Sequence, residues 1–323
     1  MINYSESKSY INYFSKGSLW IIIFFLIISC THYKLQISSI YCENKINPYG
    51  VGTNNFRFSW KITSSGRNVL QTAYQVVVTD GGNRSFKKKN IIWDSGIRQS
   101  DQSILIRYDG PVLNPGTKYY WKVKVWDNNG NESEWSKPGE FTTGLFKSED
   151  WSGAEWVAYD ELDPARRIVP GIHMPSRNEK WKNIIVGEHE LPLLRKEFKV
   201  TCRIRQALVF VSGLGHYELH LNGKKVGNHF IAPGWTDYDD YCFYNIYDIT
   251  NDIGRGDNTL GVMLGNGFYI IPNNRYRKLI AAYGYPQMLL KLKILYKDGN
   301  SEIIISDESW KTDAGPVTYS SIF

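Results

Sequence analysis

The sequence predicts an all-β protein with two β-sandwich domains in succession. Two observations carry this prediction: apolar and polar residues alternate with a period of two in many short segments, and turn signals separate those segments. No segment has the pattern of a long amphipathic helix. The length of 323 residues suffices for two ordinary domains, because single domains commonly contain about 100–150 residues.

The first sandwich is expected at residues 48–145. Apolar residues alternate with polar ones over residues 56–62, which indicates a half-buried strand. Further strands are expected at residues 74–79, 91–94, 103–108, 119–126 and 140–143. Asp127, Asn129 and Asn131 have the spacing that opens a calcium loop, but Glu132 stands where that loop needs glycine. A tight hairpin turn is therefore favoured there.

This stretch resembles a fibronectin type III-like or immunoglobulin-like domain. The resemblance lies in Trp60 on an early strand, in the segment LNPGTKYYWKVKVWD at residues 113–127, and in the ending WS…FTT. In such folds a tyrosine placed like Tyr119 ties a corner by a hydrogen bond to the backbone. The resemblance implies a fold and leaves the function open, because this sandwich hosts many roles.

The second sandwich is expected at residues 193–323, after an irregular connector at residues 146–192 that contains four prolines. Its strands are expected at residues 195–200, 207–211, 217–221, 224–226, 259–264, 288–294 and 302–305. The dipeptide Asn222-Gly223 is a strong hairpin signal between two of them. A jelly-roll-like closure is the natural arrangement.

The N-terminus has the layout of an export signal. Residues 19–28 are ten consecutive apolar residues preceded by Lys8 and Lys16, too short for a membrane span and typical of a secretory h-region. Because a small residue precedes Cys30, residues 1–30 resemble a bacterial lipoprotein signal in which Cys30 is lipidated. The alternative is an ordinary signal cleaved nearby. The expectation is an exported lipoprotein, periplasmic or cell-surface, anchored only by its lipid, with a tether at residues 31–47.

The amino-acid composition limits which binding partners can be expected. The net charge of +6 is mild and scattered, and the densest basic run, residues 87–89, lies in a Gly/Asn-rich loop, so no nucleic-acid partner is expected. The 22 Tyr, 14 Phe and 11 Trp fit strands and also sugar-stacking surfaces. Beyond Cys30, three cysteines without a CxxC pair favour buried free thiols, although Cys202 and Cys242 could pair. No metal or cofactor is expected.

Three clusters in the second sandwich carry a family likeness: LNGKKVG at residues 221–227, APGWTDY at 232–238 and LGNGFY at 264–269, with YDIT at 247–250 between the last two. In this order, after a fibronectin-like domain, they resemble the N-terminal part of a bacterial α-L-rhamnosidase of glycoside hydrolase family 78. The likeness covers residues 48–323. One departure is Phe268, where the family more often has tryptophan.

The resemblance implies that the catalytic acid and base lie in a downstream (α/α)6 barrel. The sequence ends at Phe323, which the resemblance places just short of a complete second sandwich, so we expect a truncated fold and carry over no catalytic residue. Glycoside hydrolysis needs two carboxyl groups flanking the bond. The loop carboxylates Asp237, Asp239 and Asp240 are better explained as a turn. His216 and His220 would lie about 13 Å apart on a strand, too far to share a metal ion.

Six residues are candidates for carbohydrate contact, with packing of the sandwich as the alternative role. They are Trp235, Asp237, Tyr238, Asn266, Phe268 and Tyr269. The sequence therefore favours the front portion of an exported α-L-rhamnosidase, whose partners would be a rhamnose-containing glycan and the missing barrel. The alternatives are a non-catalytic carbohydrate-binding surface lipoprotein and a broken gene product without function.

Overall fold

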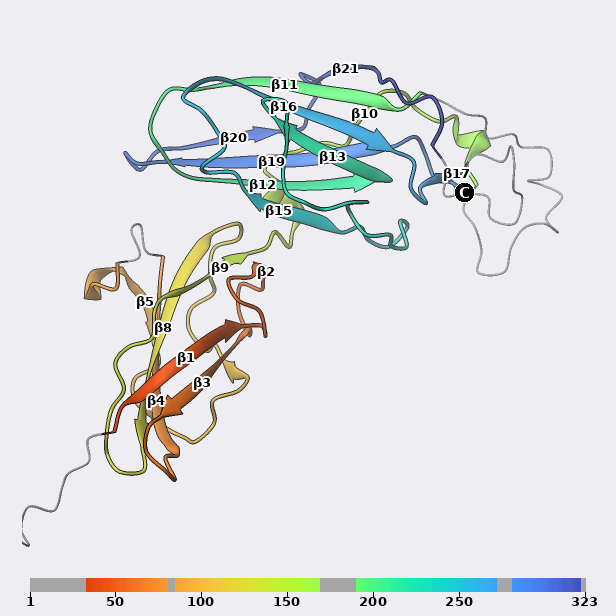
Figure 1. The fold of residues 1–323 in the computed structure, drawn as a ribbon. Coiled ribbons are helices and arrows are strands. Elements are labelled where there is room, and N and C mark those ends of the chain that lie inside the picture. The colour runs from red at the N-terminus through yellow and green to blue at the C-terminus, as the bar shows by residue number, and fades with distance from the viewer. Residues whose placement is uncertain (1–32, 81–84, 169–189, 272–280, 321–323) are drawn as a thin grey trace, which may run out of the picture.

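The computed structural model describes residues 33–80, 85–168, 190–271 and 281–320. Figure 1 shows two all-β domains, the first from β1 to β9 and the second from β10 to β21. The prediction of an all-β, two-sandwich protein is confirmed. In the described ranges no helix is long and apolar enough to cross a membrane. The apolar run at residues 19–28 and Cys30 lie outside the described residues.

The first domain consists of two sheets. One sheet has the order β1-β3-β7 and the other the order β2-β9-β8-β4-β5, with β6 also paired to β4. Their bounds are β1 Leu35–Cys42, β2 Tyr49–Val51, β3 Arg57–Ser64, β4 Gln71–Thr79, β5 Ile91–Asp94, β6 Arg98–Gln99, β7 Ile106–Arg107, β8 Lys118–Asp127 and β9 Gly139–Thr143. Neighbouring strands are antiparallel except for the β2–β9 pair, which is parallel.

The core of the first domain consists largely of aromatic residues at the apolar positions of the predicted strands. The rings of Phe58 and Trp121 lie 4.3 Å apart between the sheets, and both side chains are almost fully buried. The backbone N–H of Asn114 donates to the Tyr119 hydroxyl at 2.9 Å, which is the corner expected from the fibronectin-like resemblance. At the β8 turn, Asp127 accepts from the N–H groups of Asn129 and Asn131, so the tight turn is confirmed.

The expected tether at residues 31–47 is wrong. Residues 35–42 form β1, which pairs antiparallel with β3 and completes one sheet of the first sandwich. Leu35 and Cys42 are buried in that core, and burial raises the pKa of the Cys42 thiol. The segment forms a strand because its apolar residues Leu35, Ile37 and Ile40 pack into the core of the first domain while its backbone pairs with β3.

The second domain consists of two five-stranded sheets. One has the order β10-β19-β12-β15 with β20 also on β19, and the other has the order β14-β13-β16-β11-β21. Their bounds are β10 Val157–Ala158, β11 Pro192–Val200, β12 Ile204–Leu214, β13 His216–Leu221, β14 Lys224–Lys225, β15 Tyr244–Asp248, β16 Gly256–Gly265, β19 Gln287–Tyr296, β20 Ser301–Ile305 and β21 Lys311–Ala314. A small ribbon of β17 (Ile270–Ile271) and β18 (Ala281–Ala282) stands apart.

The core of the second domain lies between these two sheets. Met288, Leu290, Leu292 and Ile294 of β19 are fully buried, in the alternation that the sequence showed, and face apolar residues of β11, β13 and β16. Along β12, however, every residue from Ala207 to Ser212 is buried. A strand that is apolar on both faces needs cover on both faces. The face of β12 that is turned away from the core of its own sandwich is covered by the end of the first domain.

The expected connector at residues 146–192 contributes to the second sandwich. Val157 and Ala158 form β10, which pairs with β19, and Pro192 already belongs to β11. Isolated pairing of Ile168 with Ala282 ties the connector to the β17–β18 ribbon. The connector is therefore irregular but not separate from the fold. The three cysteines in the described ranges are free thiols. Cys202 is exposed, which corrects the expectation that it is buried, and Cys242 is partly buried.

Candidate functional site

The six candidate residues lie on two segments of the second domain, the loop between β14 and β15 and the turn after β16. Trp235 lies in the long loop between β14 and β15, and Phe268 lies in the turn after β16. Their rings stack at 4.9 Å with an interplanar angle of 29°. Trp235 remains 63% exposed, so one side of this pair faces solvent. The structure thus brings together two residues that are 33 positions apart and leaves them accessible.

A second aromatic group is formed by residues of the same two segments together with one residue that follows β18. Tyr238 packs edge-to-face on Tyr269 at 5.2 Å and on Tyr283 at 5.6 Å, and the latter two rings stack. Burial raises the pKa of the Tyr238 phenol to about 12, so its hydroxyl stays protonated at neutral pH. Tyr283 was not singled out from the sequence. The residues around it show no apolar–polar alternation that would distinguish a core residue from a residue of a binding site.

The loop carboxylates form a turn, as the sequence favoured. The carbonyl of Asp237 accepts from the N–H groups of Asp240 and Tyr241 at 3.1 and 3.0 Å, and its carboxylate accepts from the N–H of Asp239. Asp239 pairs with Arg167 at 2.8 Å on the surface. Within the described ranges, no cluster of three or more His, Cys, Asp or Glu side chains could hold a metal ion.

Asn266 is the buried polar member of the site. It is 2% exposed, and its side-chain amide donates to the carbonyl of Ser320 at 2.7 Å. Its Oδ1 atom is the one buried side-chain oxygen or nitrogen without a hydrogen-bond partner among the described residues. The amide therefore joins the turn after β16 to the C-terminal segment, and one acceptor in this region is left over.

The chemistry available here is binding. Exposed aromatic faces and tyrosine hydroxyls can stack on and hydrogen-bond a polar ring such as a sugar, whereas the Oδ1 atom of Asn266 is buried within the protein. The carboxylates nearby are engaged in a turn and in a surface ion pair. Of the six candidates, Trp235, Tyr238, Phe268 and Tyr269 take part in ring contacts, Asn266 is buried beside them, and Asp237 serves the turn.

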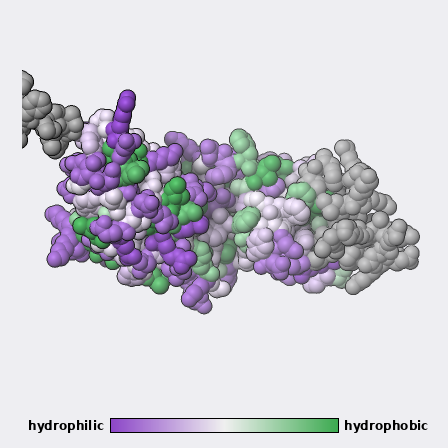
Figure 2. Space-filling model, turned by 90° about the horizontal axis from the view of Figure 1, so that it is seen from below, coloured by the Kyte–Doolittle hydropathy of each residue, from purple (hydrophilic) through white to green (hydrophobic). Residues whose placement is uncertain are grey.

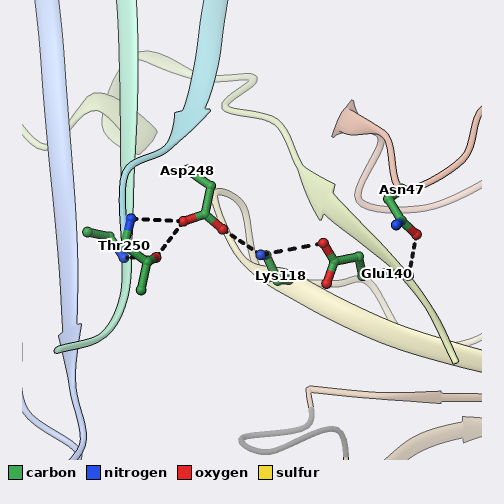
Figure 3. Close-up of polar contacts among 6 residues, drawn as sticks. Asn47, Lys118, Glu140, Asp248 and Thr250 are labelled. Atoms are coloured by element: carbon green, nitrogen blue, oxygen red, sulfur yellow. Dashed lines mark hydrogen bonds and ion pairs between the residues drawn. The ribbon is translucent and has the colours of Figure 1, made fainter. Parts of the chain in front are cut away.

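A second functional feature is the junction between the two domains. Lys118 of β8 lies between two carboxylates, 2.6 Å from Asp248 of β15 and 3.7 Å from Glu140 of β9 (Figure 3). Asp248 also accepts from the backbone and hydroxyl of Thr250. Burial disfavours both charges, yet the pairing outweighs it: the pKa of Lys118 is raised and that of Asp248 is lowered.

An apolar contact lies beside this ion pair. Leu145, at the end of the first domain, packs with Leu208, Phe210, Trp151 and Tyr244. The hydroxyl of Tyr244 accepts from the N–H of Leu145 at 2.7 Å and donates to its carbonyl at 3.0 Å. The two domains are thus joined by a packed, hydrogen-bonded contact as well as by the chain.

Two lysines on β19 lie on the strand face that the connector and the first domain cover, and sequence reasoning missed them. Lys291 is 7% exposed and donates to the carbonyl of Asp150 and the hydroxyl of Ser152. Lys293 donates to the carbonyl of Gly116 in the first domain at 3.2 Å. Burial lowers the pKa of both amines. Alternation assigns these positions to the solvent side of the strand, and it cannot show that another domain covers that side.

Two family models match the chain. Residues 37–147 match the Rha78A-like N-terminal immunoglobulin domain, and residues 202–323 match the α-L-rhamnosidase N-terminal domain. The start of the first match at residue 37 agrees with β1 being part of the first sandwich.

Similar proteins share both domains. An α-L-rhamnosidase of Formosa agariphila is 33% identical over 90% of this chain, which spans 31% of that relative. The structure of α-L-rhamnosidase from Dictyoglumus thermophilum superposes with a TM-score of 0.70 at 33% identity and covers 88% of this chain and 30% of its own. The Streptomyces avermitilis α-L-rhamnosidase complexed with L-rhamnose shares the fold, with a TM-score of 0.72 at 22% identity, over 89% of this chain and 42% of its own.

The fold and these matches define a non-catalytic, two-sandwich region of a glycoside hydrolase. The chain belongs to the α-L-rhamnosidases of glycoside hydrolase family 78 and corresponds to the N-terminal portion of its members. It spans about a third of the length of the curated relatives that it matches.

Proposed function

We propose that this chain is the front part of an exported enzyme that hydrolyses terminal α-L-rhamnose from plant glycans or glycosides. The observation that supports this most directly is the order of the two matching domains, which together account for residues 37–147 and 202–323. The catalytic acid and base would come from a downstream barrel. The two sandwiches would support that barrel or help to place the substrate.

The size of the native polypeptide tests this proposal. An antibody raised against residues 48–323 should detect a band several-fold heavier than this chain in the source cells, and that species should hydrolyse an aryl α-L-rhamnoside. The isolated chain should show no turnover above background, because the proposal places the catalytic acid and base in the downstream barrel. Turnover by the isolated chain that survives repurification would contradict the assignment of the chemistry to another domain.

A band at the size of the chain itself would favour the second candidate, a carbohydrate-binding surface protein without catalysis. The observation behind this alternative is the exposed Trp235–Phe268 pair beside the tyrosine group. The ligand would then be a rhamnose-containing oligosaccharide stacked on Trp235, with Tyr238, Tyr269, Asn266 and Asp237 as polar neighbours. Quenching of tryptophan fluorescence by such an oligosaccharide, lost in Trp235→Ala, would support it.

We further propose that Cys30 is lipidated and anchors the protein at a membrane surface. The apolar run and the small residue before Cys30 support this. The Cys30→Ala variant should lack the lipid and leave the membrane fraction, whereas Cys202→Ala, which removes an exposed thiol, should fractionate as the unmodified protein does. Unchanged membrane fractionation of Cys30→Ala would contradict the anchor.

A further inference from the structure

A groove at the junction of the two domains has walls rich in aromatic side chains. On the face shown in Figure 2, apolar residues form separate spots among polar ones, so exposure by itself marks no site. The groove differs because its residues line one cavity of about 630 Å³, within the range of about 300–1,000 Å³ that is usual for ligand pockets. Its lining includes Phe146, Trp151, Glu155, Trp156, Cys242 and Leu289.

Three parts of the chain build this junction groove. Leu145 and Phe146 follow β9 at the end of the first domain, and residues 147–156 of the connector contribute a second wall. Cys242, just before β15, and Leu289 of β19 belong to the second domain. Ligand sites occur preferentially at domain interfaces. A ligand in the junction groove would therefore touch both domains.

The walls of the junction groove are held in place by packing and hydrogen bonds. Trp151 packs edge-on against Tyr244 with ring centroids 5.4 Å apart, and the Tyr244 hydroxyl bonds both backbone groups of Leu145. A Cβ atom on Gly144 would lie 2.8 Å from the Phe146 ring, so that ring rests on the glycine backbone. Because these walls are already ordered, a ligand would not have to order them on binding.

Aromatic faces in the junction groove remain open to solvent above an apolar base. The side chains of Phe146 and Trp156 are 56% and 37% exposed. Leu145 is 5% exposed, and Cys242 and Leu289 are partly buried, so these apolar residues lie deeper. An accessible aromatic ring offers an apolar face on which the C–H face of a sugar ring can stack.

Polar side chains accompany the rings and decide which ligand fits. Glu155 and Ser148 line the groove, and within the described ranges neither the carboxylate nor the hydroxyl has a hydrogen-bond or ion-pair partner. An apolar ligand that covered them would remove them from water without compensation, which costs free energy. A sugar compensates, because its hydroxyls donate to the carboxylate while its ring lies on an aromatic face. The lining therefore favours a carbohydrate over an apolar peptide.

We propose that the junction groove is a non-catalytic binding site for a 6-deoxy sugar ring, as in terminal α-L-rhamnose. The ring would stack on Trp156, its hydroxyls would bond Glu155 and Ser148, and its methyl group would lie toward the apolar base. The choice of sugar rests on the proposed function, whereas the lining itself requires a ring with one apolar face and several hydroxyls. A glycan held here would have a raised effective concentration at the downstream catalytic domain.

Saturation-transfer NMR with methyl α-L-rhamnoside tests the site in the 323-residue chain. Saturation should reach the methyl protons of the sugar and the protons of one ring face. In Trp156→Ala the transfer should fall several-fold, because the stacking face is lost. Glu155→Gln should weaken binding about tenfold, because the hydrogen bond to the sugar loses its charge. Phe230→Ala is the control: Phe230 is 86% exposed in the loop between β14 and β15 and lines no part of the groove.

A second sugar tests the assignment to a 6-deoxy ring. Methyl α-L-mannoside carries a hydroxymethyl group where the rhamnoside has a methyl group. It should bind several-fold more weakly, because its extra hydroxyl would lose water at the apolar base. Equal binding of the two glycosides would overturn the 6-deoxy assignment.

The outcomes separate the junction groove from the proposed function. Equal transfer in Trp156→Ala and the unmodified chain would overturn the groove, as would a loss that appears only in Trp235→Ala. A native polypeptide that hydrolyses an aryl α-L-rhamnoside, combined with a chain that shows no transfer, would overturn the groove alone. Transfer that depends on Trp156 and Glu155, combined with a native polypeptide that hydrolyses no rhamnoside, would overturn the proposed function alone. If Trp156→Ala does not fold, Glu155→Gln decides, since it alters only one exposed carboxylate.

Discussion

Replacing Phe210 with alanine is expected to destabilise the chain by about 3–5 kcal/mol, the usual cost of removing a fully buried phenylalanine. Phe210 is 0% exposed, on the face of β12 turned away from the core of its own sandwich. Leu145 packs against it, and a Cβ atom on Gly116 of the first domain would meet its ring at 3.1 Å. The substitution therefore empties the apolar contact between the domains.

Urea unfolding followed by tryptophan fluorescence measures this effect, with calorimetry to show whether the domains still unfold together. We expect one transition for the unmodified chain and two for Phe210→Ala, since the variant loses the contact that couples the domains. Phe230→Ala is the matched control: Phe230 is 86% exposed, so its loss should change stability by less than about 0.5 kcal/mol. A single, unshifted transition for Phe210→Ala would show that the junction does not couple the two domains.

Replacing Lys118 with methionine is expected to cost about 2–3 kcal/mol at pH 7, somewhat less than for a fully buried pair. The side chains of Lys118 and Asp248 are 13% and 21% exposed, so solvent screens their attraction only in part. Methionine keeps most of the aliphatic stem but leaves Asp248 and Glu140 facing each other without a cation. The loss thus combines a missing ion pair with repulsion between two carboxylates.

The pKa shifts of Asp248 and Lys118 predict how the destabilisation by Lys118→Met changes with pH. The pKa of Asp248 is lowered in the folded protein, so its pairing stabilises the fold above the unfolded value of about 4 and is lost as the pH falls through the folded value. The pKa of Lys118 is raised, so its contribution persists until the pH rises above about 10.4. The difference between Lys118→Met and the unmodified chain should be largest near neutrality and shrink below about pH 4.

Thermal unfolding at pH 7 and pH 3 checks the result. Lys199→Met is the control, because Lys199 forms a fully solvent-facing pair with Asp257 and its loss should not be measurable. An equal destabilisation by Lys118→Met at both pH values would mean that the lysine acts through the packing of its aliphatic stem and not through its charge.

Much of the architecture could be predicted from alternation alone. The strands around Trp60, Trp121 and Leu219 lie where period-two patterns place them, because one face of each meets a core. The site was predicted less completely. Trp235, Phe268 and Tyr269 were selected from motifs, and their mutual contacts required the fold. Tyr283 and Arg167 carry no local signal, since their roles depend on residues far along the chain.

By itself, the sequence determined the fold class and the two sandwiches, because burial of one strand face is encoded in local alternation. Only the tertiary structure showed which strands are covered on their outer face as well as on the face toward the core. Lys291 and Lys293 stand at positions that a lone sandwich would expose, and β1 occupies a segment expected to be a tether. The two lysines escape prediction because cover supplied by a distant segment leaves no periodic trace in the strand that it covers. β1 becomes a strand because Leu35, Ile37 and Ile40 pack into the core of the first domain.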